Sequence, residues 1–167
     1  MKYCRNTTIN HVISQTHTNC LIDLNSLIVR EGFAGVNRLF VNGEIVLDLD
    51  LAETIFAGIE NRKEKNKSMD MAFGLTNADA TKRQMLLVEL KFNVRDVYSL
   101  RKNDLEGKVE SSCNLLGNDP AIYQRFIFIV KTENIQEAIS RFFRMIPKID
   151  SKYVVLDIHL LKEQYFN

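Results

Sequence analysis

The stretch Gln84-Met85-Leu86-Leu87-Val88-Glu89-Leu90-Lys91-Phe92 has the alternating pattern of a β-strand and decides the fold predicted for this chain. Successive side chains of a strand point to opposite faces of a sheet. One predicted face is wholly apolar and consists of Leu86, Val88, Leu90 and Phe92, and the other consists of Leu87, Glu89 and Lys91. A carboxylate and an ammonium group are therefore expected side by side on one face.

A second acid, Asp70, lies in the earlier apolar run Met69-Asp70-Met71-Ala72-Phe73, whose alternation directs the acid away from the Met and Phe side chains. Two such strands side by side would bring Asp70, Glu89 and Lys91 to one edge of a sheet. Carboxylate oxygens suit Mg²⁺ or Mn²⁺, which bind few protein carboxylates and keep open positions for water and phosphate. The pattern predicts such an ion at Asp70 and Glu89. The alternative is a surface salt bridge, because opposite charges commonly pair on the polar face of a strand.

An Asp followed by Glu-x-Lys at the end of an apolar strand resembles the active-site signature of the restriction-endonuclease-like, or PD-(D/E)XK, nuclease superfamily. The resemblance covers residues 48 to 132 in the order of elements. It implies that Asp70 and Glu89 hold the metal and that Lys91 positions the attacking water or steadies the phosphate. Two features depart from the superfamily pattern: Met69 replaces the proline before the first acid, and one strand rather than two is predicted between the leading helix and Glu89.

The helix predicted at 50–61 adds two candidate metal ligands. Asp50 is expected to be its N-cap, with Glu53 completing a capping box. In some nucleases of the superfamily a helical glutamate before the first strand adds a metal contact, and the resemblance implies this role for Glu60 or Glu53. The preferred interpretation is a solvated surface glutamate.

Basic residues before and after the two strands are candidate nucleic-acid contacts, namely Lys65, Lys67, Lys82, Arg83, Arg101, Lys102 and Lys108. Contacts from such residues to phosphates would position a nucleic acid without reading its sequence. For the cations in 61–67 the alternative is a favourable interaction with the C-terminal end of the helix dipole. The net charge of +1 means that any basic surface must be local.

The predicted elements, in chain order, are short N-terminal helices, a hairpin at 38–49 that turns at Asn42-Gly43, a helix at 50–61, strands at 69–73 and 84–92, a helix at 99–116, a strand at 125–131, a helix at 134–145 and a strand at 153–160. This order predicts an α/β fold, a single domain with a central mixed β-sheet flanked by helices. The resemblance adds a restriction-endonuclease-like core. Within the single domain 1–167, residues 1–47 would form the N-terminal helices and hairpin, and residues 48–167 the nuclease-like core.

The cysteines Cys4, Cys20 and Cys113 are odd in number and widely spaced, which predicts free thiols and a cytoplasmic protein. No apolar run approaches ~18 residues and no signal-peptide pattern is present, so no membrane partner is expected. His11 and His17, taken with Cys4 and Cys20, do not have the spacing of a zinc site.

Asp157 and His159 share one face of the strand predicted at 153–160. A catalytic pair is one interpretation, but ordinary polar-face spacing is preferred.

Two functions remain open at this point. The first, and the leading hypothesis, is a Mg²⁺-dependent nuclease-like protein that hydrolyses phosphodiester bonds, with nucleic acid as its partner. The second, as the alternative, is a noncatalytic protein-interaction module on the same fold, such as an immunity, antitoxin or assembly partner, which would bind a protein. The length of 167 residues and the near-neutral charge favour the second, because a free-standing nuclease usually needs extra surface to grip its substrate. The sequence has neither a glycine-rich phosphate loop nor a Gly-x-Ser-x-Gly elbow, which counts against nucleotide-driven and hydrolase-triad chemistry.

Overall fold

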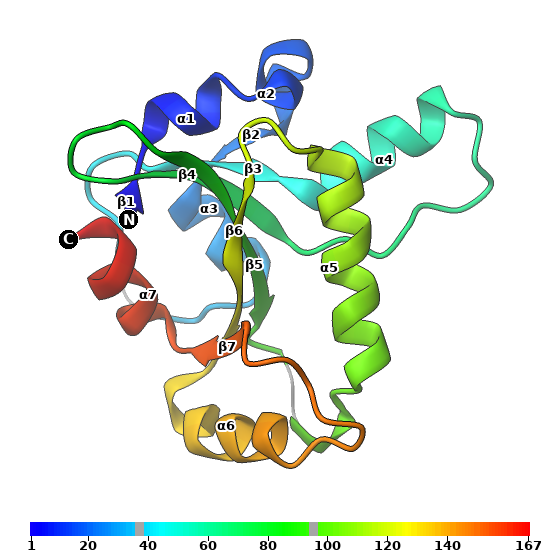
Figure 1. Ribbon diagram of the computed structural model, residues 1–167, viewed down its shortest axis with the longest axis vertical. Coiled ribbons are helices and arrows are strands. Elements are labelled where there is room, and N and C mark those ends of the chain that lie inside the picture. The colour runs from blue at the N-terminus through cyan, green and yellow to red at the C-terminus, as the bar shows by residue number, and fades with distance from the viewer. Residues whose placement is uncertain (36–38, 94–96) are drawn as a thin grey trace.

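Strand β5 (Arg83–Lys91) is at the centre of the fold, because it pairs antiparallel with β4 (Met71–Thr76) and parallel with β6 (Ile122–Val130). In the computed structural model these strands belong to a seven-stranded mixed sheet of order β2-β3-β4-β5-β6-β7, with β1 paired to β4 (Figure 1). Helices flank this sheet, so the predicted α/β class and single domain with a central mixed sheet are confirmed.

The structure describes residues 1–35, 39–93 and 97–167. Its other strands are β1 (Lys2–Tyr3), β2 (Leu21–Asp23), β3 (Ile45–Asp48) and β7 (Tyr153–Leu156). Its α-helices are α1 (Arg5–Ile9), α2 (Val12–Thr16), α3 (Leu24–Arg30), α4 (Leu49–Ile59), α5 (Lys102–Leu116), α6 (Ile135–Phe143) and α7 (Ile158–Phe166). Short 3-10 turns lie at Thr18–Cys20, Val97–Ser99 and Thr132–Asn134.

The sheet separates two apolar cores. Leu86 and Leu90 of β5 are buried on one face with side chains of α3 and α7, whereas Leu87 is buried on the other face with side chains of α5 and α6. The alternation predicted from the sequence is therefore confirmed. It places Glu89 and Lys91 on the α5 side of the sheet.

Helix α5 is the crossover that the parallel pairing of β5 and β6 requires, and it lies against the sheet beside β5 (Figure 1). Leu105 and Val109 anchor it in the core. Gly117 follows its last residue with a positive φ of 72°, a conformation that glycine adopts without strain. The helix predicted over this part of the chain is confirmed.

The hairpin predicted at 38–49 is wrong. In the described residues 39–44 no strand forms, and β3 pairs instead with β2 on one side and β4 on the other. The side-chain amide of Asn25 explains the difference: it donates to the Phe40 carbonyl at 2.6 Å and accepts from the Phe40 amide at 3.0 Å. These bonds satisfy backbone groups that a strand partner would otherwise take. Arg38, part of the predicted strand, lies outside the described residues.

The strand predicted at 153–160 is half wrong, because β7 ends at Leu156 and a helix follows. The Asp157 side chain accepts from the Leu160 amide at 2.8 Å, which is the geometry of an N-cap. His159 is exposed on the first turn of α7. The two residues therefore do not share the polar face of a strand.

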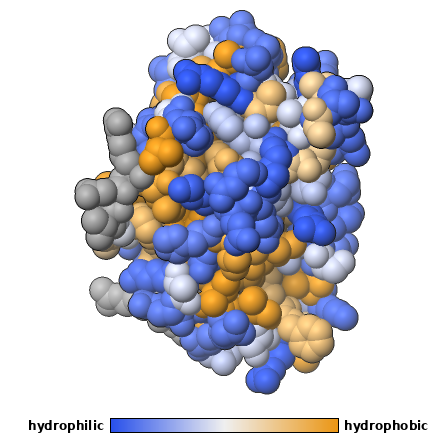
Figure 2. Space-filling view, turned by 90° about the vertical axis from the view of Figure 1, so that its left-hand side faces the viewer, coloured by the Kyte–Doolittle hydropathy of each residue, from blue (hydrophilic) through white to orange (hydrophobic). Residues whose placement is uncertain are grey.

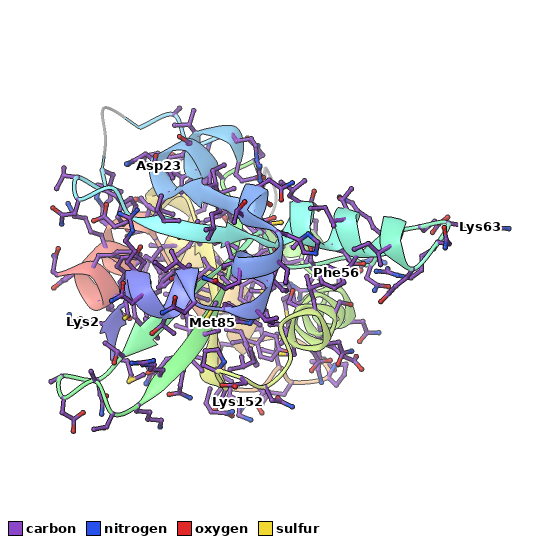
Figure 3. The ribbon with its side chains drawn as sticks, turned by 90° about the horizontal axis from the view of Figure 1, so that it is seen from above. Lys2, Asp23, Phe56, Lys63, Met85 and Lys152 are labelled. Carbon is purple, nitrogen blue, oxygen red and sulfur yellow. The ribbon has the colours of Figure 1, made fainter. Side chains whose placement is uncertain are left out.

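Helix α4 begins two residues earlier than its expected capping box. Asp48, rather than Asp50, is the N-cap, and its side chain accepts from the Leu51 amide at 3.1 Å. Asp48 also forms an ion pair of 2.6 Å with Arg30 of α3, which ties the two helices together. The outer end of α4 projects from the rest of the domain, with Lys63 beyond it pointing into solvent (Figure 3).

The surface is mostly hydrophilic but carries an apolar area in the lower half of one face, at the height of β7 and α6 (Figure 2). The large apolar side chains Phe143 and Ile146, at and just beyond the end of α6, are 78% and 96% exposed. None of the helices in the described part of the chain combines the length and apolar character that a bilayer span requires.

Replacing Asp157 by alanine should lower the free energy of unfolding by about 1 kcal/mol, because the α7 N-terminus loses the side-chain acceptor of the Leu160 amide. His159→Ala, a change at an exposed position of the same turn, should alter it by less than about 0.5 kcal/mol. Chemical denaturation followed by circular dichroism measures both. Equal losses for the two variants would contradict the N-cap role.

Candidate functional site

Asp70 and Glu89 lie at neighbouring positions across β4 and β5. Met71 pairs with Val88, so the residue before β4 is opposite Glu89. The Leu90 amide of β5 donates to the Asp70 carboxylate at 2.5 Å and holds that carboxylate against the strand. The two acids expected at one edge of the sheet are thus brought together.

Glu89 is fully buried beneath α5. Its Oε1 atom lies 2.5 Å from the Nζ of Lys91 and 2.5 Å from the Nζ of Lys108. Its Oε2 atom is also buried and has no hydrogen-bond partner among the described residues. Buried polar atoms almost always have a partner, and an unpaired carboxylate oxygen in the interior costs free energy. Glu89 Oε2 is therefore free to accept a further contact.

The two lysines reach Glu89 from different elements. Lys91 is two residues further along β5 and therefore shares its face, as the sequence predicts, whereas Lys108 comes from α5. Lys108 was predicted to contact nucleic acid, and its contact with Glu89 was not predicted. Its helical spacing could have indicated this contact, because Lys108 is one turn after Leu105 and one turn before Ser112, and both of these residues are buried on the same face of α5.

Burial raises the pKa of Asp70 to about 7, and the negative charge of Glu89 adds to this effect. The hydrogen bond from the Leu90 amide and the charge of Lys108 act in the opposite direction and only partly offset it. Burial lowers the pKa of Lys108, but the charge of Glu89 and the hydrogen bond to it prevail and leave the pKa raised. The cluster therefore favours the charged form of Lys108, while Asp70 lies in an environment that disfavours its negative charge.

This donor set fits a hard divalent cation. Two carboxylates lie opposite each other on adjacent strands, one of their oxygens is unpartnered, and burial together with the charge of Glu89 raises the pKa of Asp70. In the described ranges no group of three or more His, Cys, Asp and Glu side chains is arranged to hold a metal. A site at Asp70 and Glu89 would thus supply two protein ligands, which suits Mg²⁺ because this ion usually keeps several waters.

Glu53 and Glu60 have other partners. Arg62 donates to Glu53 at 2.6 Å through Nη1 and to Glu60 at 2.6 Å through Nε, and Glu53 also accepts from the Asn66 amide at 2.7 Å. Glu53 is buried and holds the segment after α4 against the helix, whereas Glu60 is exposed. Glu53 therefore has a structural role, which is to bind Arg62 and the Asn66 amide rather than to complete the expected capping box.

Most of the expected basic surface is paired with acids or lies far from the cluster. The exposed pairs are Lys65 with Asp50, Lys67 with Asp104 and Lys102 with Glu106. Lys82 and Arg83 lie at the beginning of β5, about 20 Å along the strand from Glu89. Arg101 lies just before α5, at the end of that helix away from β6. Around Glu89, Lys91 and Lys108 are the cations that the structure brings together.

His11 and the cysteines are explained by packing. His11 is buried, its Nδ1 accepts from the Ile13 amide, and its Nε2 is 3.2 Å from the Leu116 carbonyl. Burial lowers the pKa of His11. Cys4, Cys20 and Cys113 are free thiols.

Asp70→Asn should stabilise the protein above neutral pH. The pKa of Asp70 is about 7 in the folded protein and 3.8 when unperturbed, so the folded state binds more protons between these values. The free energy of unfolding of the wild type therefore falls as pH rises from about 4 to about 7. Asparagine removes this loss, and the variant should gain on the order of 2 kcal/mol relative to wild type between pH 4 and pH 8.

The measurement is urea denaturation across this pH range. Asp104→Asn, which removes an exposed acid on α5, is the control and should follow the wild type. A stability difference between Asp70→Asn and wild type that does not change with pH would contradict the raised pKa.

No model of a known protein family, no curated protein and no solved structure matches this chain. The atoms of the cluster itself are therefore the basis for assigning it a function.

Proposed function

We propose that the protein is a divalent-metal-dependent, nuclease-like hydrolase of phosphodiester bonds, with its site at Asp70, Glu89 and Lys91. The observation that carries this proposal is the unpartnered, buried Oε2 of Glu89 beside the Asp70 carboxylate. The resemblance to the restriction-endonuclease-like superfamily rests on the same three residues and supports the same chemistry.

Asp70 and Glu89 would hold Mg²⁺ or Mn²⁺. When bound, the ion supplies Lewis-acid stabilisation of phosphoryl oxygens and a water that is more acidic than bulk water. The protein's own contribution is orientation: the Leu90 amide fixes the Asp70 carboxylate, and burial under α5 fixes Glu89. Such preorganised groups need little rearrangement when charge develops in a transition state.

Lys91 is the candidate for contact with the reacting groups. Its Nζ contacts Glu89, and the Lys91 side chain is 22% exposed, whereas that of Glu89 is not exposed. An ammonium group has three donors, so a contact to Glu89 leaves donors for a water or a phosphate oxygen. Lys91 would therefore orient the attacking water or neutralise charge on the phosphate.

A noncatalytic interaction module is the second candidate function. It is favoured by the pairing of Lys65, Lys67 and Lys102 with acids, which leaves little free basic surface for a nucleic acid. The exposed Ile139 and Phe143 of α6 also favour it, because they line the same pocket and exposed apolar patches mark interaction sites. In this alternative the cluster at Glu89 only joins α5 to the sheet.

Mn²⁺ or Mg²⁺ should raise the melting temperature of the wild type, because an ion that binds the folded state alone stabilises it by roughly 3 kcal/mol at a hundred times its Kd. Asp70→Asn should abolish the rise, since it removes one of the two charged ligands. Thermal unfolding with and without the ion, at constant ionic strength, measures the effect. Asp104→Asn is the matched control and should respond like the wild type. Equal stabilisation of all three proteins, or of none, argues against a metal site here.

Lys91→Met should reduce phosphodiester cleavage by about 10²-fold or more, the scale of removing one preorganised electrostatic group. Stabilisation by Mn²⁺ should survive, because Lys91 is not a ligand. The assay compares the two proteins on single- and double-stranded DNA and RNA with added metal at matched salt. If the wild type cleaves none of these substrates in a metal-dependent way, the nuclease proposal fails and the interaction module becomes the preferred function.

A further inference from the structure

We propose that Lys108 joins Lys91 to form a two-lysine site for one phosphate group on the solvent side of Glu89. In the reaction this site would hold the scissile phosphodiester, so that part of the inference rests on the proposed function. Binding of a phosphate anion by the two lysines does not depend on the proposed function. Lys108 would then bind substrate from α5, an element that carries none of the other proposed site residues.

The geometry places the two ammonium groups together. Both Nζ atoms are 2.5 Å from the same oxygen, Glu89 Oε1, so they are no farther apart than twice that distance. The side chains of Lys91 and Lys108 are 22% and 21% exposed, whereas that of Glu89 is 0% exposed. The Glu89 carboxylate is thus buried, whereas the two lysine side chains that contact it are partly exposed.

The charges leave room for an anion. Of the acids in the described ranges, Glu89 is the one within ion-pair distance of either ammonium group, and the charge of Asp70 acts on Lys108 from farther away. Each ammonium group has three donors, and Glu89 Oε1 uses one from each. A phosphodiester carries one negative charge and two free oxygens, which could each accept from one lysine.

Helix α5 fixes Lys108 relative to both acids. Ser112, one turn after Lys108 on the same helix face, accepts from the Met69 amide at 2.8 Å. Met69 directly precedes Asp70, so the two contacts attach α5 to the β4 end that carries Asp70 and to Glu89 of β5.

Inorganic phosphate and dimethyl phosphate are the probes, added to the metal-free full-length protein with EDTA present. Chemical shifts of the lysine side chains in NMR spectra report binding, and potassium chloride at equal ionic strength corrects for salt. The wild type should bind both probes, and Lys108→Met and Lys91→Met should each weaken binding by at least about tenfold, since each removes one of two charged donors. Lys102→Met, a change to a paired lysine on the same helix, is the control and should bind as the wild type does.

Lys108→Gln keeps a donor for Glu89 and serves as the second variant if Lys108→Met unfolds, with thermal unfolding of each variant as the check. It should also lose phosphate binding, because the charge is gone. Equal binding by the wild type and a folded Lys108 variant would overturn the proposal, and so would the absence of binding to the wild type. Phosphate binding that depends on Lys108, in a protein that shows no metal-dependent cleavage, would uphold the anion site while the proposed hydrolase function fails.

Discussion

The buried carboxylate of Glu89 is the constraint on which this part of the structure depends. A charge without solvent contact costs several kcal/mol unless charged groups and hydrogen bonds compensate it. Here the compensation comes from Lys91 on the same strand and from Lys108 on the helix that covers it. Because α5 supplies one of the two cations, the helix and the sheet cannot slide past each other without exposing an unpaired charge. The position of α5 thus follows from electrostatics as well as from the apolar contacts of Leu105 and Val109.

The features that could be predicted from the sequence are those that depend on the regular spacing of apolar residues along one strand or helix. The alternation around Glu89, the apolar stripe of α5 and the central sheet flanked by helices all follow from the spacing of apolar residues, and the structure agrees. The meeting of Asp70 with Glu89 was also predicted, because an antiparallel pair brings the start of one strand to the end of the next. Lys108 was placed on the wrong surface, since no local pattern shows which side chain of a distant helix will face a buried acid.

The wrong hairpin has a similar cause. Asn42-Gly43 does turn the chain, and Gly43 has the positive φ of 65° that such a turn favours. A turn becomes a hairpin only if the flanking segments bond to each other, and here the side chain of Asn25 satisfies the backbone of Phe40 instead. That contact joins residues far apart in the chain. In the same way, Asp157 begins a helix because its side chain bonds to the Leu160 amide, a choice that the alternating pattern of 153–160 concealed.

The negative charge of Asp70 destabilises the folded protein. Its carboxylate lies beside that of Glu89, and like charges at neighbouring positions of a sheet are destabilising. Among the described residues, the Leu90 amide donates the hydrogen bond that holds the Asp70 side chain, and the oxygen of an asparagine amide could accept the same bond without the charge. The two lysines already compensate Glu89. Burial of the Asp70 charge beside Glu89 therefore works against folding, whereas a divalent cation held between the two acids would use that charge.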